Sequence, residues 1–93
     1  MRLPEIINYG NYSSNNYGKH SLQISFDKLD LYYSYDTIIA FRTIETGLVI
    51  CKNEWWTTTG KHLNWINPDK KIRIDREKFI EQLSKTLVKF NLV

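Results

Sequence analysis

The chain has 93 residues and a net charge of +3, which fits a single domain over residues 1–93. Its hydrophobic residues make up 42% of the sequence and its aromatic residues 14%, enough to fill one core. This mild charge excludes a strongly acidic DNA mimic and is compatible with an anionic partner without requiring one.

The first twenty residues are predicted to form a loop-rich segment that folds onto the domain. The tripeptide Asn-Tyr-Gly occurs at residues 8–10 and again at residues 16–18, with Asn and Ser between the two copies. Gly, Asn and Ser favour turns, and the tyrosines supply rings that can pack against a core. We expect an ordered loop after a short strand over residues 5–9, with a mobile arm as the alternative.

Residues 21–52 predict an antiparallel meander of four strands. Apolar and polar side chains alternate over residues 21–26 and 29–35, and only two residues, Asp and Lys, separate these runs. Two more apolar runs, at residues 37–43 and 48–52, follow after short connections. Connections of about two to four residues join antiparallel neighbours, because parallel strands need a crossover of about a dozen residues or more.

Residues 53–70 are predicted to form a Trp- and Thr-rich loop, because their apolar side chains follow no regular period. Within this loop, Thr58 or Thr59 can cap a short helical turn over residues 61–66, which Pro68 would end. The following short run of alternating residues, Lys71 to Ile74, suggests an edge strand instead of a continuation of the loop.

A C-terminal helix is predicted over residues 75–91, with Asp75 as its N-cap. One helical stripe contains the apolar residues Phe79, Ile80, Leu83, Leu87 and Phe90. The fold class is therefore α+β: an antiparallel four- to five-stranded meander with one C-terminal helix packed on one face. The opposite face, which carries Tyr32 and Arg42, is expected to be half open to water.

No motif for catalysis or for a cofactor is found. The segment Thr57–His62 lacks the phosphate-loop pattern, because Trp55 stands where that loop needs its first Gly and His62 where it needs Ser or Thr. With only two histidines, a metal site is not predicted, and Cys51 is expected to be a small core residue. We predict no enzyme activity, no cofactor and no metal. The hydroxyls, Gly60 and Lys61 of this segment still suit an anion at a helix N-terminus, with a capped turn as the alternative.

A partner-binding surface is predicted where the loop at residues 57–66 meets the loop at residues 8–18. Tyr and Trp give large contact areas with few rotatable bonds, and Asn, Ser and Thr adapt their hydrogen bonds. Adjacent Trp55 and Trp56 cannot both face inward if this segment is extended, so one exposed Trp is expected. The alternative is that these rings close the ends of the core. The predicted contacts are Tyr12, Tyr17, Trp56, Lys61, His62 and Trp65.

Basic residues gather in the second half of the chain. Residues 52–93 contain nine Lys and Arg against five Asp and Glu, whereas residues 1–51 contain four against five. The densest run suggests phosphate contacts, with a solvated strand and helix start as the alternative. The candidate phosphate contacts are Lys70, Lys71, Arg73 and Arg76.

Four segments carry a resemblance to a known family. They are, in order, NYGNYSS at residues 8–14, LYYSY at 31–35, IAFR at 39–42 and TTGKHLNWI at 58–66. In these segments the chain resembles a family of short uncharacterised proteins encoded by phages and mobile elements. The resemblance implies a phage or prophage origin and carries over no activity and no site residue.

Small phage accessory proteins often act by binding, so the resemblance suggests a non-catalytic protein that modulates or inhibits a host or defence protein, as anti-CRISPR proteins do. The alternative is a nucleic-acid-binding module that uses the basic region at residues 61–78 and exposed aromatic rings. An edge strand and exposed tyrosines also allow a homodimer. The longest apolar runs have four residues and no secretion signal precedes them, so we expect a cytoplasmic protein of a bacterial or archaeal host and no membrane partner.

Overall fold

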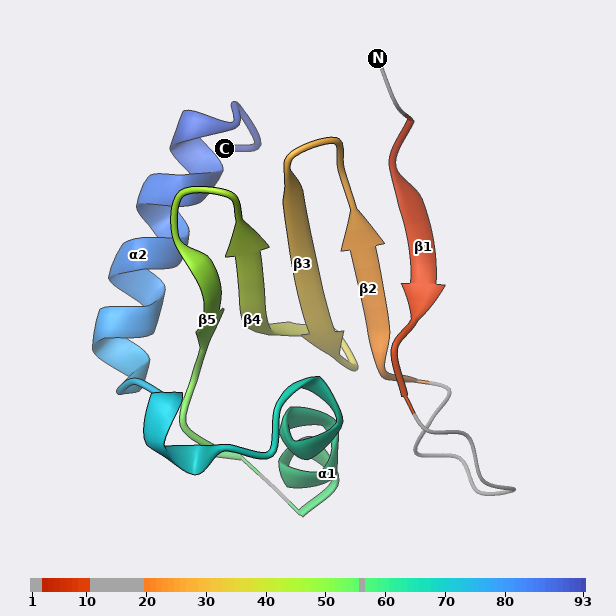
Figure 1. Ribbon diagram of the computed structural model, residues 1–93, viewed down its shortest axis with the longest axis vertical. Coiled ribbons are helices and arrows are strands. Elements are labelled where there is room, and N and C mark those ends of the chain that lie inside the picture. The colour runs from red at the N-terminus through yellow and green to blue at the C-terminus, as the bar shows by residue number, and fades with distance from the viewer. Residues whose placement is uncertain (1–2, 11–19, 56) are drawn as a thin grey trace.

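The computed structural model describes residues 3–10, 20–55 and 57–93. Five antiparallel strands pair in chain order, and two α-helices and a short 3₁₀ helix follow them (Figure 1). The elements are β1 (Glu5–Asn8), β2 (Leu22–Ser25), β3 (Leu29–Ser34), β4 (Thr37–Thr43), β5 (Gly47–Ile50), α1 (Thr57–Ile66), η2 (Lys70–Ile72) and α2 (Arg76–Lys89). The predicted α+β class and antiparallel meander are confirmed, with β1 as the fifth strand.

Short turns fix the order of the strands. The predicted hairpin between β2 and β3 closes through the Phe26 amide, which donates to the Leu29 carbonyl at 2.7 Å. Between β3 and β4 the register shifts: Tyr32 pairs with Ala40, and Tyr33 pairs with Ile38. Ile39 is therefore the extra residue of a β-bulge. Both it and the neighbouring Ala40 are fully buried in one hydrophobic cluster.

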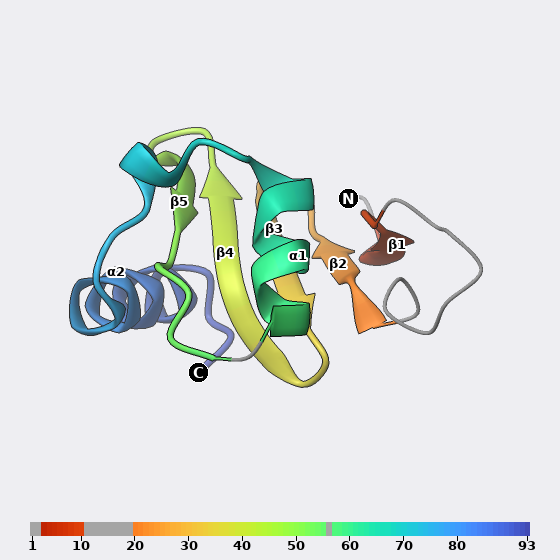
Figure 2. The same cartoon turned by 90° about the horizontal axis from the view of Figure 1, so that it is seen from below.

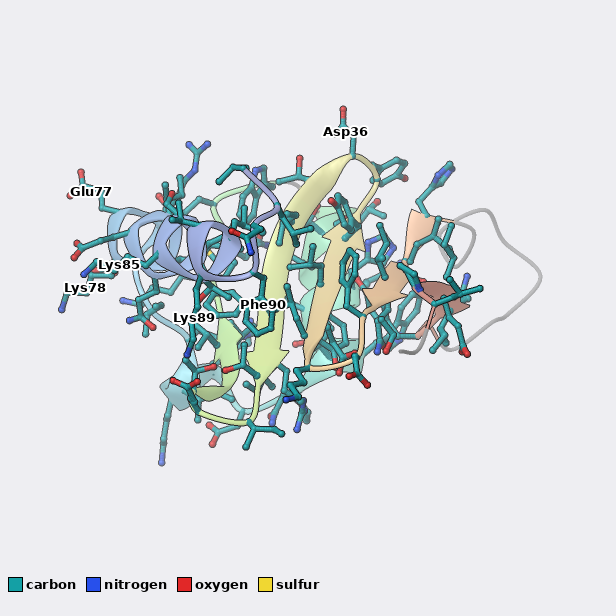
Figure 3. All side chains as sticks on the ribbon, turned by 90° about the horizontal axis from the view of Figure 1, so that it is seen from above. Asp36, Glu77, Lys78, Lys85, Lys89 and Phe90 are labelled. Atoms are coloured by element: carbon teal, nitrogen blue, oxygen red, sulfur yellow. The ribbon has the colours of Figure 1, made fainter. Side chains whose placement is uncertain are left out.

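Helix α2 packs its apolar stripe against alternate residues of the sheet. Phe79 is buried with Leu29, Leu31 and Phe41, and the rings of Phe41 and Phe79 lie 5.7 Å apart. Further along the stripe, Leu83, Leu87 and Phe90 pack against the same cluster. Figure 3 shows Phe90 lying toward the strands, whereas Lys78 and Lys85 point away from them. Ile80, which was predicted to belong to the stripe, is 45% exposed.

Helix α1 is longer than the short turn expected, and it covers residues that the sequence had left half open to water. Its Leu63 is fully buried with Tyr32, Ile39 and Ile50, which alternate along the strands with the residues that meet α2. Tyr32 is only 8% exposed, so the expectation of an open face was wrong for Tyr32, although Arg42 is exposed. Figure 1 shows α1 at the end of the sheet where β3 ends and β4 begins.

The expected edge strand over residues 71–74 is not formed. Residues 70–72 form η2, for which the Asp69 carboxylate accepts a hydrogen bond from the Lys71 amide at 2.9 Å. Only Ile74 pairs with the sheet, through a parallel bridge to Cys51. Asp69 therefore caps a 3₁₀ turn that contains Lys70 and Lys71, and these residues do not pair with the edge of the sheet.

We predict that Phe79→Ala lowers the free energy of unfolding by about 3–5 kcal/mol, because it leaves a cavity in the core. Ile80→Ala is the matched control, since its side chain is the next along the same helix and is half exposed. The control should cost less than about 1 kcal/mol. Urea unfolding of the two variants measures this difference, and equal losses would show that α2 packs through another face.

Candidate functional site

A buried polar network joins α1 to the end of β3. The Ser34 hydroxyl lies 2.6 Å from Nδ1 of His62 and 3.0 Å from the Thr59 hydroxyl, and all three side chains are buried. Buried polar groups need such partners, because each one left unpaired costs about 1–3 kcal/mol. The spacing of Ser34 and His62 resembles a nucleophile and its base. However, Ser34 is 3% exposed and His62 is fully buried, so a substrate cannot reach the pair in this conformation.

His62 was predicted to contact a partner, and its burial corrects that prediction. The helix turns His62 inward beside Leu63, while Lys61 and Asn64 on either side of this pair are exposed. The His62 ring lies 5.4 Å from the ring of Trp65, which is half-buried. Thus the buried His62 ring packs beneath Trp65. Lys61 is exposed and Trp65 is half-buried, so both remain accessible to a partner.

An exposed aromatic pair lies beside this network, at the turn between β3 and β4. The rings of His20 and Tyr35 stack at 4.3 Å with 17° between their planes, and Tyr35 is 48% exposed. The Tyr35 ring also lies 5.9 Å from the buried His62. We call His20, Tyr35, Lys61 and Trp65 the aromatic surface.

The backbone of Tyr35 is in the left-handed region, with φ of 57°. This conformation costs an L-residue roughly 1–2 kcal/mol. Neighbouring contacts hold it in place, since the Tyr35 amide donates to the His20 carbonyl at 3.0 Å. Strain of this kind often marks functional positions. Sequence reasoning assigned Tyr35 to a sheet face and missed this role, because no Gly or Asn signals the turn.

Residues 8–10 of the N-terminal segment lie against α1, where the Tyr9 ring is 6.4 Å from the His62 ring. The Tyr9 hydroxyl donates to the Tyr33 carbonyl at 2.8 Å, and its ring packs edge-on against Tyr32 at 5.5 Å. Burial raises the pKa of the Tyr9 phenol well above its usual range, with the nearby Tyr32 adding to the shift, so Tyr9 stays a protonated donor. A Cβ on Gly10 would lie 3.1 Å from the Trp65 ring. The predicted contacts Tyr12, Tyr17 and Trp56 lie outside the described residues.

Three of the predicted phosphate contacts, Lys70, Lys71 and Arg73, lie apart from the aromatic surface, whereas Arg76 lines a pocket with Asp36 at the β3–β4 turn. Lys70 and Lys71 are exposed on η2, and Arg76 at the start of α2 lies 5.9 Å over the Trp55 ring. Arg73 is only 8% exposed and donates to the Asn64 side chain. Figure 2 shows η2 and the β3–β4 turn on different sides of α1. The exposed ring of Tyr35 and the lysines of η2 therefore do not form one surface.

Cys51 lies in the core and is poorly suited to nucleophilic chemistry. Burial raises the pKa of its thiol to about 11, and the charge of Glu54 adds to the shift. Within the ranges that the structure describes, no group of three or more His, Cys, Asp or Glu side chains is placed to hold a metal ion. No helix in the same ranges is both long and apolar enough to span a bilayer.

Comparison with known families places the chain in a family that has no assigned activity. A family described as a family of unknown function, DUF8033, matches residues 3–82. The chain belongs to this family. No curated protein and no solved structure matches the chain. The resemblance to an uncharacterised family is thus confirmed, whereas its phage origin stays a prediction.

We predict that His62→Ala lowers the free energy of unfolding by about 2–4 kcal/mol, because it removes a buried ring and leaves Ser34 without its closest partner. The double variant with Ser34→Ala should lose less than the sum of the single losses, since each change removes the same hydrogen bond. Urea unfolding of the four proteins measures this coupling. If His62→Ala leaves the free energy of unfolding unchanged, His62 is not part of the core, and the sequence-based prediction of a partner contact stands.

Proposed function

We propose that this protein is a non-catalytic accessory protein that binds and modulates another protein through the aromatic surface. The observation that carries the proposal is the exposed Tyr35 ring, which is stacked on His20 and held in a strained backbone conformation. A rigid exposed ring loses little conformational entropy on binding, and such rings are frequent anchors of protein interfaces. The resemblance to phage-encoded proteins supports a host or defence protein as the partner.

The neighbouring charges favour a protein partner over nucleic acid at this surface. Stacking of nucleic acid needs basic side chains close to the rings, to neutralise the phosphates. Here the exposed Asp36 follows Tyr35 directly, and Figure 3 shows it at the tip of the turn. The 3₁₀ helix η2, which carries Lys70 and Lys71, lies on the other side of α1 from this turn (Figure 2). Lys61 stands one turn before Trp65 on α1, and Arg76 lines a pocket with Asp36. Both cations suit ion pairs at the edge of a protein interface.

The test uses a photocrosslinker, p-benzoylphenylalanine, placed at Tyr35. In a nuclease-treated lysate of host cells, we expect a discrete protein adduct from this position. Placing the crosslinker at Ile44 gives the control, because Ile44 is 86% exposed and follows the opposite end of β4. Equal adducts from both positions would contradict the proposal. So would an adduct that forms in an untreated lysate and is lost when the lysate is treated with nuclease.

Competition separates binding from folding. Excess wild-type protein should suppress the adduct, and the variant Tyr35→Asn should be at least about 30-fold weaker as a competitor, as expected for a hot-spot residue. Asn tolerates the left-handed conformation, so the free energy of unfolding should change by less than about 1 kcal/mol. A Tyr35→Asn protein that competes as well as the wild type would rule out Tyr35 as the anchor.

A further inference from the structure

A cleft of about 330 Å³ lies on the side of α1 that carries Gly60 and Asn64. It is lined by Lys52, Asn53, Gly60, Asn64, Lys70 and Arg73. Three of these residues are cations and none carries a carboxylate. The cleft is therefore positively charged, and its volume is at the small end of the range for ligand sites.

Arg73 is the unusual member of this lining. Its side chain is more than nine-tenths buried, and Nη2 donates to Oδ1 of Asn64 at 2.9 Å and to the Asn67 carbonyl at 3.2 Å. Both acceptors are neutral. The Nε atom is buried without a hydrogen-bond partner, and no carboxylate of the described residues forms an ion pair with Arg73.

Such a guanidinium is costly without a counter-charge. An arginine is always ionised, and burying an ion that no opposite charge balances carries a penalty of several kcal/mol. The other charges of the lining do not balance it, since Lys52 and Lys70 are also cations, and Lys52 is itself paired with Asp75 at 3.0 Å. The folded chain thus holds a buried positive charge beside an open, positively charged cleft.

The backbone is also arranged to keep the cleft open. Gly60 lies inside α1, where a glycine destabilises a helix relative to alanine. A Cβ at this position would lie 3.0 Å from Nδ2 of Asn53, which is a tight contact. Gly60 therefore allows the side-chain amide of Asn53, which is a neutral hydrogen-bond donor, to approach the helix at the cleft.

We infer that this cleft binds a phosphate group, with the Arg73 guanidinium as its main charge partner and Lys70 and Asn53 as further donors. A guanidinium is always charged and forms strong, charge-assisted hydrogen bonds to phosphate. The phosphate supplies the counter-charge that the chain does not. This site lies apart from the aromatic surface and does not depend on the proposed protein partner. The ligand is free phosphate or the terminal phosphate of a larger molecule, since the two share this chemistry.

Thermal unfolding in sodium phosphate, against sodium chloride of the same ionic strength and pH, tests the inference. We expect a saturable rise in Tm of about 5–10 °C in phosphate, because a ligand that binds only the folded state stabilises it by mass action. The Nε–H signal of Arg73 in NMR spectra should shift along the same titration. Equal Tm values in the two salts, with an unmoved Arg73 signal, would overturn the inference.

The variant Asn64→Asp keeps the shape and the acceptor oxygen of Asn64 but adds a carboxylate beside Arg73. It should raise Tm in chloride and weaken phosphate binding at least tenfold, because the counter-charge is then internal. Asn67→Asp is the control with the same change in net charge, since Asn67 contacts Arg73 only through its carbonyl and does not line the cleft. The control should bind phosphate within about twofold of wild type. If phosphate raises the Tm of Asn64→Asp as much as that of the wild type, the ion binds elsewhere and the assignment is wrong.

Two hexanucleotides, identical except for a 5′-phosphate, separate the sources of the ligand. Binding that needs the 5′-phosphate and is lost in Asn64→Asp supports a terminal phosphate on a larger molecule. A response to inorganic phosphate alone supports the free ion. Equal binding of both oligonucleotides, unchanged in Asn64→Asp, would show a general attraction to polyanions and would contradict a built site.

Discussion

The contact between Ser34 and His62 is the interaction on which the functional end of the molecule depends. It joins the last residue of β3 to the middle of α1, and Thr59 adds a second hydroxyl from the first turn of the helix. The same contact sets the distance between α1 and the end of β3. Leu63, next to His62, fills the cluster around Tyr32, Ile39 and Ile50 as a result. Without the polar contact, the buried Ser34 hydroxyl would lose its closest partner, and an unpaired buried polar group costs about 1–3 kcal/mol.

Both proposed binding regions follow from the position of α1. One side of the helix meets the residues around Tyr9 and the β3–β4 turn, where the strained Tyr35 presents its ring. The other side carries Gly60 and Asn64 into the cleft around Arg73. A single helix thereby separates an aromatic region from a basic one. This separation is why a single nucleic-acid surface that combined stacking with phosphate contacts is the weaker account of the protein.

Local patterns in the sequence predict the meander and α2 well. Alternation over residues 21–26 and 29–35 indicates which side chains face together, and the short connections leave only antiparallel order. The stripe of α2 has the helical period, and four of its five predicted members pack on the core. Ile80 departs from this, because it lies at the margin of the stripe.

The site was harder to predict because its signals run against ordinary residue preferences. Helix α1 starts with three threonines and contains a glycine, so its propensity is poor. Its inward residues, Thr59, His62, Leu63 and Ile66, do have helical spacing, but two of them are polar. The sequence predicts a helix cap for Thr59 and a partner contact for His62. Arg73 was predicted as a phosphate contact, with a solvated strand as the alternative, and its charge gave no sign that its side chain would be buried. Tyr35 lacks the Gly or Asn that its conformation favours, and only packing in three dimensions shows that it is held there.

Hydrogen exchange of α1 in the Ser34→Ala variant tests most directly whether the buried polar contact holds the helix. The account predicts that the amides of α1 lose protection selectively by about tenfold or more, which corresponds to roughly 1.4 kcal/mol or more of local opening free energy. The amides of α2 and of strands β3 to β5 should keep most of their protection. An equal loss at every amide would contradict the account, because it would mean that Ser34 contributes only to global stability.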